Sequence, residues 1–273
     1  MSAEVGIVET RNIIRLINEL YQYDFSDFAL TSFKRRLENL IVVHNLKTAD
    51  NLFTKIREDK IFFDIMLHEI IVEPTEMFRD PSLWRLLRDE YIPLFTKNNG
   101  HFKIWFPMTV SGEDLYSFLI LLKETGQRDK CEIIVSHISE KSKETISAGR
   151  IKISKLEVSK DNYTRFHGAA KFEDYCQVKE NSLYFNESLY KDVTFSPQHL
   201  IFDGGPKLVD MIFFRNQMLY YNQGFQDRVL DVFYDSLNFN GYLVPGIRER
   251  FFLVVARKNL RLTDANENIY QKK

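Results

Sequence analysis

Three polar residues follow an apolar run in the last third of the chain, and their types suit the binding of a carboxylate. Residues 209–213 read VDMIF, Arg215 and Asn216 follow Phe214, and Tyr220 lies four residues beyond Asn216. If the run is a buried strand of an α/β sheet, these side chains point into the crevice at its carboxyl end, where such sheets bind ligands. Arg215 could then orient a substrate carboxylate, and Tyr220 could flank the reacting group. A salt-bridged or solvated arginine is the alternative.

A strand, a loop and a helix are expected over residues 102–122, which read FKIWFPMTVSGEDLYSFLILL. The strand-to-helix loop of α/β enzymes often binds nucleotides, because glycines there let the backbone approach the ligand. Only Gly112 is present in this loop, and Met108 and Val110 would crowd the approach. An ordinary loop with Ser111 as the helix N-cap explains the same residues.

A histidine stands at the end of the next predicted strand, where an acid typically binds the ribose of a nucleotide. Residues 132–135 read EIIV, and Ser136 and His137 follow. A neutral imidazole offers one acceptor where a carboxylate offers two oxygens, so ribose binding through His137 should be weak and pH dependent. A half-buried structural histidine is an equal alternative.

A further candidate segment is EPTEMFRDPSLWRLL, residues 73–87. Asp80 as N-cap and Pro81 at the first helical position account for a helix start without any function. Thr75 and Arg79 are then left without a structural reason.

Composition excludes several classes of function. Lys and Arg number 37 against 38 Asp and Glu, which offers no field for nucleic acid or an anionic membrane, and no apolar run is long enough to span a bilayer. The two cysteines fit no redox or zinc spacing, so we expect a reducing, cytoplasmic location. The six histidines are scattered, and hydrolase and phosphate-loop motifs are absent, so we expect no metal site.

The pattern of apolar residues divides the chain in two. Residues 8–72 are helical in period and predict about four helices, with a domain boundary at residues 73–74 before Pro74. Short apolar runs then alternate with helical stretches, which predicts a doubly wound α/β sheet over residues 74–273. Three short alternating pieces within residues 174–196 predict a small antiparallel insert, and the polar tail at 264–273 is expected to fray.

Five phrases, in order, resemble those of the CheR family of methyltransferases along nearly the whole chain. They are DFSDF with KRRL at 24–28 and 34–37, TEMFRD at 75–80, WFPMTVSGEDLYS at 105–117, FRNQMLYY at 214–221 and NGYL at 240–243. In the third phrase Met108 stands where the family has its first glycine.

The resemblance implies a helical N-terminal domain, a Rossmann-like domain that binds S-adenosylmethionine, and a small antiparallel subdomain that docks on the receptor. CheR methyltransferases esterify glutamates of bacterial chemoreceptors and release S-adenosylhomocysteine, so the implied partner is a chemoreceptor or a receptor-like helical protein. We expect a monomer that binds no nucleic acid.

The resemblance also implies roles for individual residues. Arg215 and Tyr220 would flank the methyl-transfer site, and the implied cofactor-binding residues are Thr75, Arg79, Gly112, Glu113, His137, His199 and Asn216. Of these, Glu113 would accept the amino group of the methionine end. His137 and His199 replace a ribose-binding aspartate and an adenine-side asparagine, which implies weakened or lost cofactor binding. A CheR-like docking module without catalysis is therefore the alternative function.

Overall fold

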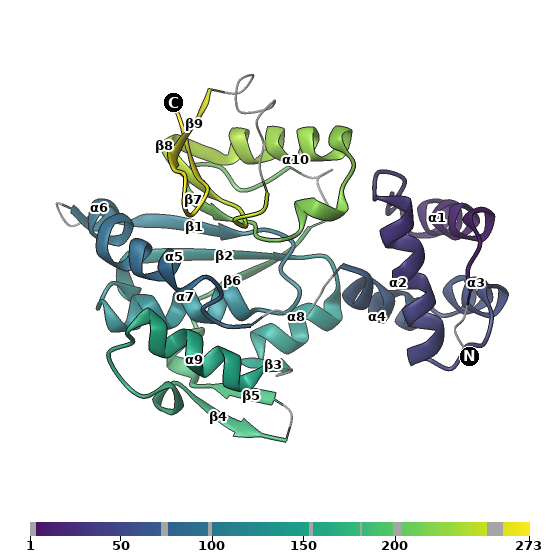
Figure 1. The fold of residues 1–273 in the computed structure, drawn as a ribbon, viewed down its shortest axis with the longest axis horizontal. Helices are drawn as coiled ribbons and strands as arrows, with labels where there is room; N and C mark the ends of the chain where they lie inside the picture. The colour runs from purple at the N-terminus through teal and green to yellow at the C-terminus, as the bar shows by residue number, and fades with distance from the viewer. Residues whose placement is uncertain are drawn as a thin grey trace.

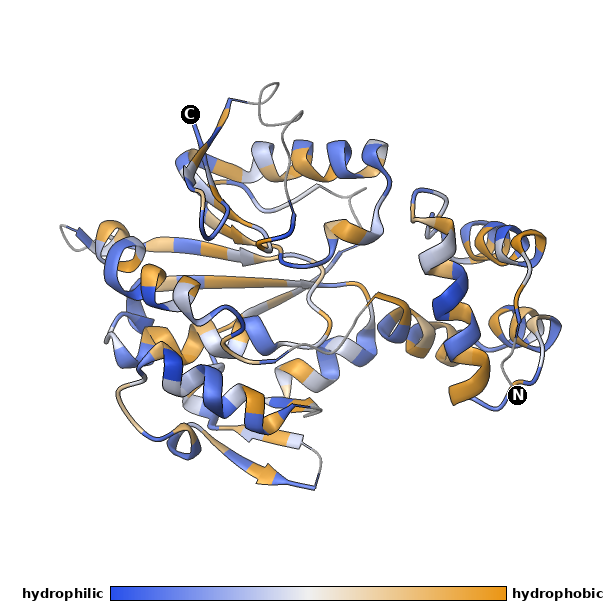
Figure 2. Cartoon of the chain, in the orientation of Figure 1, coloured by the Kyte–Doolittle hydropathy of each residue, from blue (hydrophilic) through white to orange (hydrophobic). Residues whose placement is uncertain are grey.

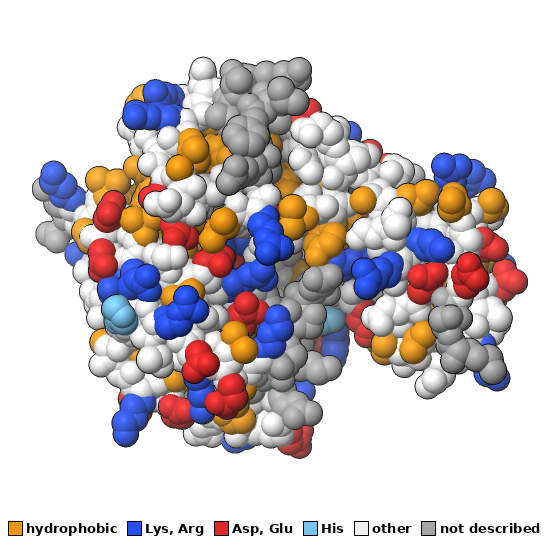
Figure 3. All heavy atoms as spheres, in the orientation of Figure 1, with side chains coloured by type: hydrophobic (Ala, Val, Ile, Leu, Met, Phe, Trp, Pro, Cys, Tyr) orange, Lys and Arg blue, Asp and Glu red, His pale blue; other side chains and the backbone are white. Residues whose placement is uncertain are grey.

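The computed structural model describes residues 4–71, 76–97, 100–152, 155–180, 182–198, 204–249 and 259–273. It has a helical N-terminal part and a larger α/β part, which lie beside each other in Figure 1. Figure 3 shows Lys and Arg side chains interspersed with Asp and Glu over the face in view, in keeping with the near-neutral composition.

Four helices make up the N-terminal part: α1 (Ile7–Tyr21), α2 (Leu30–Val43), α3 (Ala49–Glu58) and α4 (Lys60–Ile71). Each buries side chains at three- and four-residue steps, as Phe33, Leu37 and Leu40 do on α2. The Thr48 hydroxyl accepts a hydrogen bond from the N–H of Asn51 and so caps α3. The helical period predicted for residues 8–72 is confirmed as far as the described chain reaches, and the predicted boundary at 73–74 lies outside the described residues.

A seven-stranded sheet in the order β6-β2-β1-β7-β8-β10-β9 forms the centre of the α/β part. Its strands are β1 (Phe102–Phe106), β2 (Cys131–His137), β6 (Thr194–Pro197), β7 (Val209–Phe213), β8 (Leu237–Val244), β9 (Leu260–Asp264) and β10 (Ile269–Lys272). Strands β6, β2, β1, β7 and β8 run parallel to one another, and β10 is antiparallel to both β8 and β9. The predicted Rossmann-like α/β fold is confirmed.

Helices connect these strands and lie on both sides of the sheet in Figure 1. They are α5 (Pro81–Leu86), the π-helical turn η1 (Leu87–Tyr91), α6 (Ile92–Thr96), α7 (Glu113–Glu124), α8 (Glu140–Ser147), α9 (Leu156–Phe166) and α10 (Gln223–Ser236). Short 3-10 turns lie at η3 (Arg128–Lys130), η4 (Phe172–Asp174), η5 (Glu187–Leu189) and η6 (Met218–Tyr220).

Alternate residues of β1 pack on opposite faces of the sheet. The Trp105 ring meets Phe233 of α10 with ring centroids 5.6 Å apart, while Phe106 meets Phe118 of α7 at 5.8 Å. Because both faces are covered, the central strands are apolar along most of their length, as the orange strands of Figure 2 show. The helices show hydrophilic and hydrophobic residues in alternation in the same figure, as expected of amphipathic helices.

The small antiparallel sheet is present with a different membership from the one predicted. It has the order β3-β5-β4, with β3 (Arg150–Lys152), β4 (Cys176–Lys179) and β5 (Ser182–Phe185). The prediction that residues 193–195 belong to this insert is wrong, because β6 pairs in parallel with β2 and forms an edge of the large sheet. The sequence of a four-residue strand is too short to indicate which sheet the strand joins.

The C-terminal tail also differs from the prediction that it frays. Ile269 and Tyr270 are buried, and β10 pairs with two strands. These two apolar side chains stabilise the tail by burial, which the polar composition of the segment hides.

Two predicted helix caps have other roles. Gly112, not Ser111, is the N-cap residue of α7, with φ of 88°. Asp80 does precede α5, but its side chain makes no cap hydrogen bond and pairs with a distant arginine instead.

The helical part packs directly on the α/β part. Asp64 of α4 accepts hydrogen bonds from the N–H groups of Glu140 and Lys141, both at 2.9 Å, at the start of α8. The hydroxyl of Tyr23 donates to the carbonyl of Ile138 at 3.1 Å. One hydrophobic cluster is continuous from the helical part to the α10 side of the sheet.

Candidate active site

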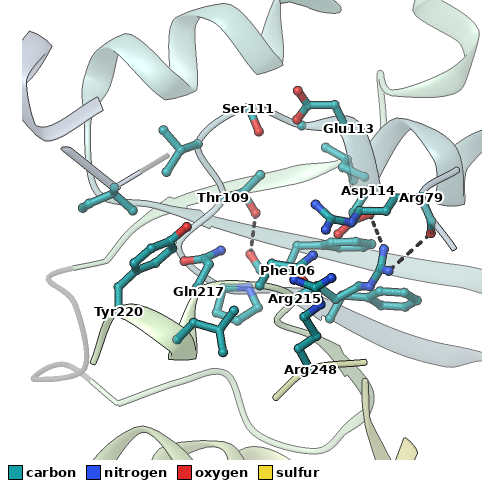
Figure 4. Close-up of a pocket in the computed structure, with 18 of the residues that line it drawn as sticks. Arg79, Phe106, Thr109, Ser111, Glu113, Asp114, Arg215, Gln217, Tyr220 and Arg248 are labelled. Carbon is teal, nitrogen blue, oxygen red and sulfur yellow. Dashed lines mark hydrogen bonds and ion pairs between the residues drawn. The ribbon is translucent and has the colours of Figure 1, made fainter. Parts of the chain in front are cut away.

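A pocket of about 390 Å³ opens at the carboxyl ends of β1 and β7. Its lining comes from the loop after β1, the loop after β7, the segment before α5 and the turn after β8 (Figure 4). Six of the predicted site residues line it: Arg79, Gly112, Glu113, Arg215, Asn216 and Tyr220. Neighbouring parallel strands whose chain connections leave in opposite directions open such a crevice, so its position follows from the topology.

The loop after β1 reaches the pocket through two residues in the left-handed region of backbone space. Gly112 has φ of 88° and Met108 has φ of 49°. The Thr109 N–H donates to the carbonyl of Ser136 at 2.7 Å, which ties this loop to the end of β2. Glu113 then begins α7, and its side chain is buried beside the pocket.

The Met108 conformation is costly for a residue with a Cβ, by about 1 kcal/mol. Its side chain is buried and packs near the hydroxyl of Tyr221, with the sulfur 3.9 Å from the oxygen. This burial offsets the backbone cost and fills space behind the loop.

Arg215 is held by two carboxylates. Its Nη2 lies 2.6 Å from Asp80 Oδ2 and its Nη1 lies 2.7 Å from Asp114 Oδ1. The Arg215 side chain is 1% exposed, and Nη2 also donates to the Arg79 carbonyl at 3.3 Å. The salt-bridged arginine considered as the alternative is therefore what the structure contains, at the edge of the pocket (Figure 4).

Arg79 and Lys155 also line the pocket, and they share an acid. Glu76 lies 4.0 Å from Arg79 and 3.0 Å from Lys155, as measured between their charged atoms. Two cations and one carboxylate leave this part of the lining with a positive balance.

Tyr220 is positioned by the helical part of the chain. The N–H of Ala29 donates to the Tyr220 carbonyl at 2.9 Å, and the Arg36 guanidinium lies 4.3 Å from the centre of the Tyr220 ring. A guanidinium over an aromatic face is attracted by the ring's quadrupole. The helical part thus contacts a predicted catalytic side chain, although it is separated from it by almost 200 residues of sequence.

The loop after β7 is fixed by a buried acid that the sequence analysis missed. The Glu249 carboxylate accepts hydrogen bonds from the N–H groups of Asn216 at 2.8 Å, Met218 at 2.7 Å and Gly246 at 2.6 Å. Burial raises the pKa of Glu249 to about 6, against the three N–H donors, which lower it. At neutral pH the carboxylate is mostly ionised and holds the loop that carries Asn216 and Tyr220.

His137 lies at the end of β2, as predicted, and is absent from the described pocket lining. It is 2% exposed, and its Nε2 is buried with no hydrogen-bond partner in the described part of the chain. Burial lowers the pKa of His137, so the ring is neutral at pH 7. The neighbouring Met108, Val110 and Ile138 are buried apolar side chains.

Two predicted cofactor-binding residues, Thr75 and His199, lie outside the described residues. Three charged lining residues were missed, Asp114, Lys155 and Arg248. Asp114 could have been found as the second acid at the start of a helix facing Arg215, whereas nothing in the sequence marks Arg248.

The described chain has no group of His, Cys, Asp and Glu side chains that could hold a metal ion. Among the same residues, no helix is both long and apolar enough to cross a membrane.

Comparison with known proteins gives a consistent result. Residues 73–266 match the family described as CheR methyltransferase, SAM binding domain. A Pseudomonas putida protein named "Putative methyltransferase Cher3" is 29% identical over 242 residues, covering 89% of this chain and 88% of that protein. A Listeria innocua protein named "Chemotaxis protein methyltransferase" is 22% identical over 237 residues, covering 86% and 87% of the two chains. A Borreliella burgdorferi protein of the same name is 24% identical over 258 residues, covering 88% and 87%.

Proposed function

Because the chain belongs to the CheR methyltransferase family, we propose that it transfers the methyl group of S-adenosylmethionine to glutamate carboxylates of a chemoreceptor-like helical protein. The observation that carries the proposal is the pocket at the ends of β1 and β7, which gathers Arg79, Glu113 and Tyr220 from three separate segments. The names of the Listeria and Borreliella relatives support a chemotaxis substrate.

The pocket residues suit the amino-acid end of the cofactor. The Arg79 guanidinium can pair with a carboxylate, and the Glu113 carboxylate can accept hydrogen bonds from an ammonium group. Gly112 and Asn216 line the same space. When bound, the cofactor supplies an electrophilic methyl group on a sulfonium centre.

The acceptor needs alignment rather than a base. A glutamate side chain has a pKa of about 4.3 and is ionised at neutral pH. A carboxylate oxygen forms the new bond to the methyl carbon as the sulfur–carbon bond breaks, and no proton moves. The task of the chain is to hold the two groups in line and keep water away, which suits the apolar walls formed by Phe106, Phe213 and Leu219.

The test is methyl transfer to the cytoplasmic helical hairpin of a chemoreceptor, with the cofactor labelled in its methyl group. We expect label on the hairpin that alkali releases as volatile methanol, as a carboxyl ester requires. Label that resists alkali, or no label with a hairpin that an active CheR methyltransferase does modify, would contradict the proposal.

A second function, docking on a receptor without catalysis, is favoured by one observation. The position expected to bind ribose holds a buried neutral His137, and Met108 and Val110 of the loop tied to the end of β2, with Ile138 after it, are buried apolar side chains. Polar contacts to a nucleoside are worth about 1–3 kcal/mol each, so their loss would weaken binding about ten- to a hundredfold per contact.

The variant His137→Asp separates the two functions. A carboxylate there restores two acceptor oxygens, and we expect S-adenosylhomocysteine to bind about tenfold more tightly, as measured by calorimetry. A docking module without a cofactor pocket would give no binding heat with either protein. Unchanged affinity in a protein that does bind would refute the ribose assignment of His137.

A further inference from the structure

We propose that Arg248 binds the carboxylate of the substrate glutamate, while Arg215 acts as a fixed structural ion pair behind it. This inference rests on the proposed function and names the residue of the same pocket that binds the carboxylate of the substrate. Arg248 stands on the turn after β8 and lines the pocket with an exposed side chain.

Within the described part of the chain, Arg248 differs from the other cations of the lining in having no acid partner. Arg215 is paired with Asp80 and Asp114, and Arg79 and Lys155 share Glu76. Over the described residues, the Arg248 guanidinium makes no hydrogen bond or ion pair. It is therefore the lining cation whose charge and five N–H donors are available to a ligand.

Arg215 is poorly placed to bind a substrate. Its Nη2 donates to Asp80 and to the Arg79 carbonyl, its Nη1 donates to Asp114, its Nε is buried, and its side chain is only 1% exposed. Together with Asp80 and Asp114 it forms a group of net charge −1, which repels an approaching carboxylate. Binding of the substrate by Arg215 would require one of two short ion pairs to break.

The turn that carries Arg248 is rigidly held. Glu249 accepts from the Gly246 N–H at 2.6 Å, and the Asn268 side chain donates to the carbonyls of Gly246 at 3.1 Å and Glu249 at 2.5 Å. The hydroxyl of Tyr270 donates to Asn268 Oδ1 at 2.9 Å. A fixed backbone limits the entropy that Arg248 loses when it binds.

The direction of the Arg248 side chain agrees with this role. Figure 4 shows it extending toward Gln217 and Arg215, with Tyr220 entering the pocket from the other side. A carboxylate held bidentately by the planar Arg248 fork would lie between these groups. Tyr220, predicted to flank the methyl group, would then be on the far side of the acceptor.

The test compares binding of a chemoreceptor cytoplasmic helical hairpin that carries its methyl-accepting positions either as glutamate or as glutamine. Titrations use the full chain with S-adenosylhomocysteine present, for the wild type, Arg248→Gln, Arg248→Lys and the control Arg261→Gln. Arg261 is an exposed arginine of β9 outside the pocket lining.

We expect the wild type and the control to bind the glutamate hairpin about 10- to 100-fold more tightly than the glutamine hairpin. Arg248→Gln should lose this preference, and Arg248→Lys should keep part of it. In methyl-transfer assays of the same samples, Arg248→Gln should raise KM for the hairpin by a similar factor with kcat nearly unchanged.

Two results would overturn the inference. One is a wild-type preference for glutamate that survives in Arg248→Gln, and the other is a wild type that binds both hairpins equally. A preference that depends on Arg248 in a protein that transfers no methyl group would support the inference and refute the proposed function, so the two failures are distinguishable.

Discussion

Replacement of Glu249 by glutamine should destabilise the fold and loosen the loop after β7. Both carboxylate oxygens accept backbone N–H groups, one from Met218 and the other from Asn216 and Gly246. A glutamine amide presents an NH2 group to at least one of these donors. A buried N–H without an acceptor costs about 1–3 kcal/mol, so we expect Glu249→Gln to lower the free energy of unfolding by about 2–3 kcal/mol at pH 7.5.

The same variant should show a defined pH dependence. The pKa of Glu249 is about 6 in the folded protein against a reference value of 4.5. A carboxyl whose pKa is raised by folding contributes stability that is fully present below the unfolded pKa and lost as pH rises through the folded pKa. The wild type therefore gains roughly 1 kcal/mol from this group between pH 7.5 and pH 5, and Glu249→Gln does not. The cost of the substitution should be larger at pH 5 than at pH 7.5 by that amount.

Urea unfolding of wild type and Glu249→Gln at the two pH values measures both effects. The control is Glu144→Gln, because the Glu144 side chain is 71% exposed and its ion pair with Lys141 is long, at 3.8 Å. Stability of Glu249→Gln within about 0.5 kcal/mol of the wild type would refute the reasoning about the loop. A cost independent of pH would refute the raised pKa.

Three further substitutions test other parts of the structure. Asp64→Ala removes the acceptor at the start of α8 and should lower the free energy of unfolding by about 1–2 kcal/mol in urea. Arg215→Gln leaves Asp80 and Asp114 without their counter-charge and should lower the free energy of unfolding by about 2–3 kcal/mol, a modest cost for a buried pair because both acids are partly exposed. Met108→Gly relieves about 1 kcal/mol of backbone strain but loses more than that in buried side chain, so it should lower the free energy of unfolding in urea. Stability equal to that of the wild type in Asp64→Ala, Arg215→Gln or Met108→Gly would contradict the corresponding contact.

The elements of the α/β part could be predicted from sequence because their local signals are strong. The strand at 102–106 and the helix beginning at Glu113 agree with β1 and the start of α7, and the strand at 209–213 agrees with β7. Each of the two strands is an apolar run that is buried on both faces of the sheet, and each is followed by residues at which the strand ends. The sheet partner of residues 193–195 could not be predicted, because β6 and β2 are about 60 residues apart in sequence and a four-residue strand has no face pattern of its own.

The sequence predicted where the site residues lie along the chain better than it predicted which residues they contact. Arg215 was placed at the end of its strand, but Asp80 and Asp114 lie 135 and 101 residues away in sequence, and no spacing rule links them. The role of Glu249 was missed for the same reason, since its N–H donors come from the loop after β7 and from its own turn. Thr75 and His199 stay predictions.

The most direct test of the proposed function is a calorimetric titration of the purified protein with S-adenosylhomocysteine. The account predicts a single site with a dissociation constant in the micromolar range, because Arg79 and Glu113 line the pocket where we propose that the amino-acid end of the cofactor binds, while a histidine stands at the proposed ribose position. Absence of binding heat at millimolar ligand would contradict it and leave a receptor-docking protein built on a methyltransferase fold.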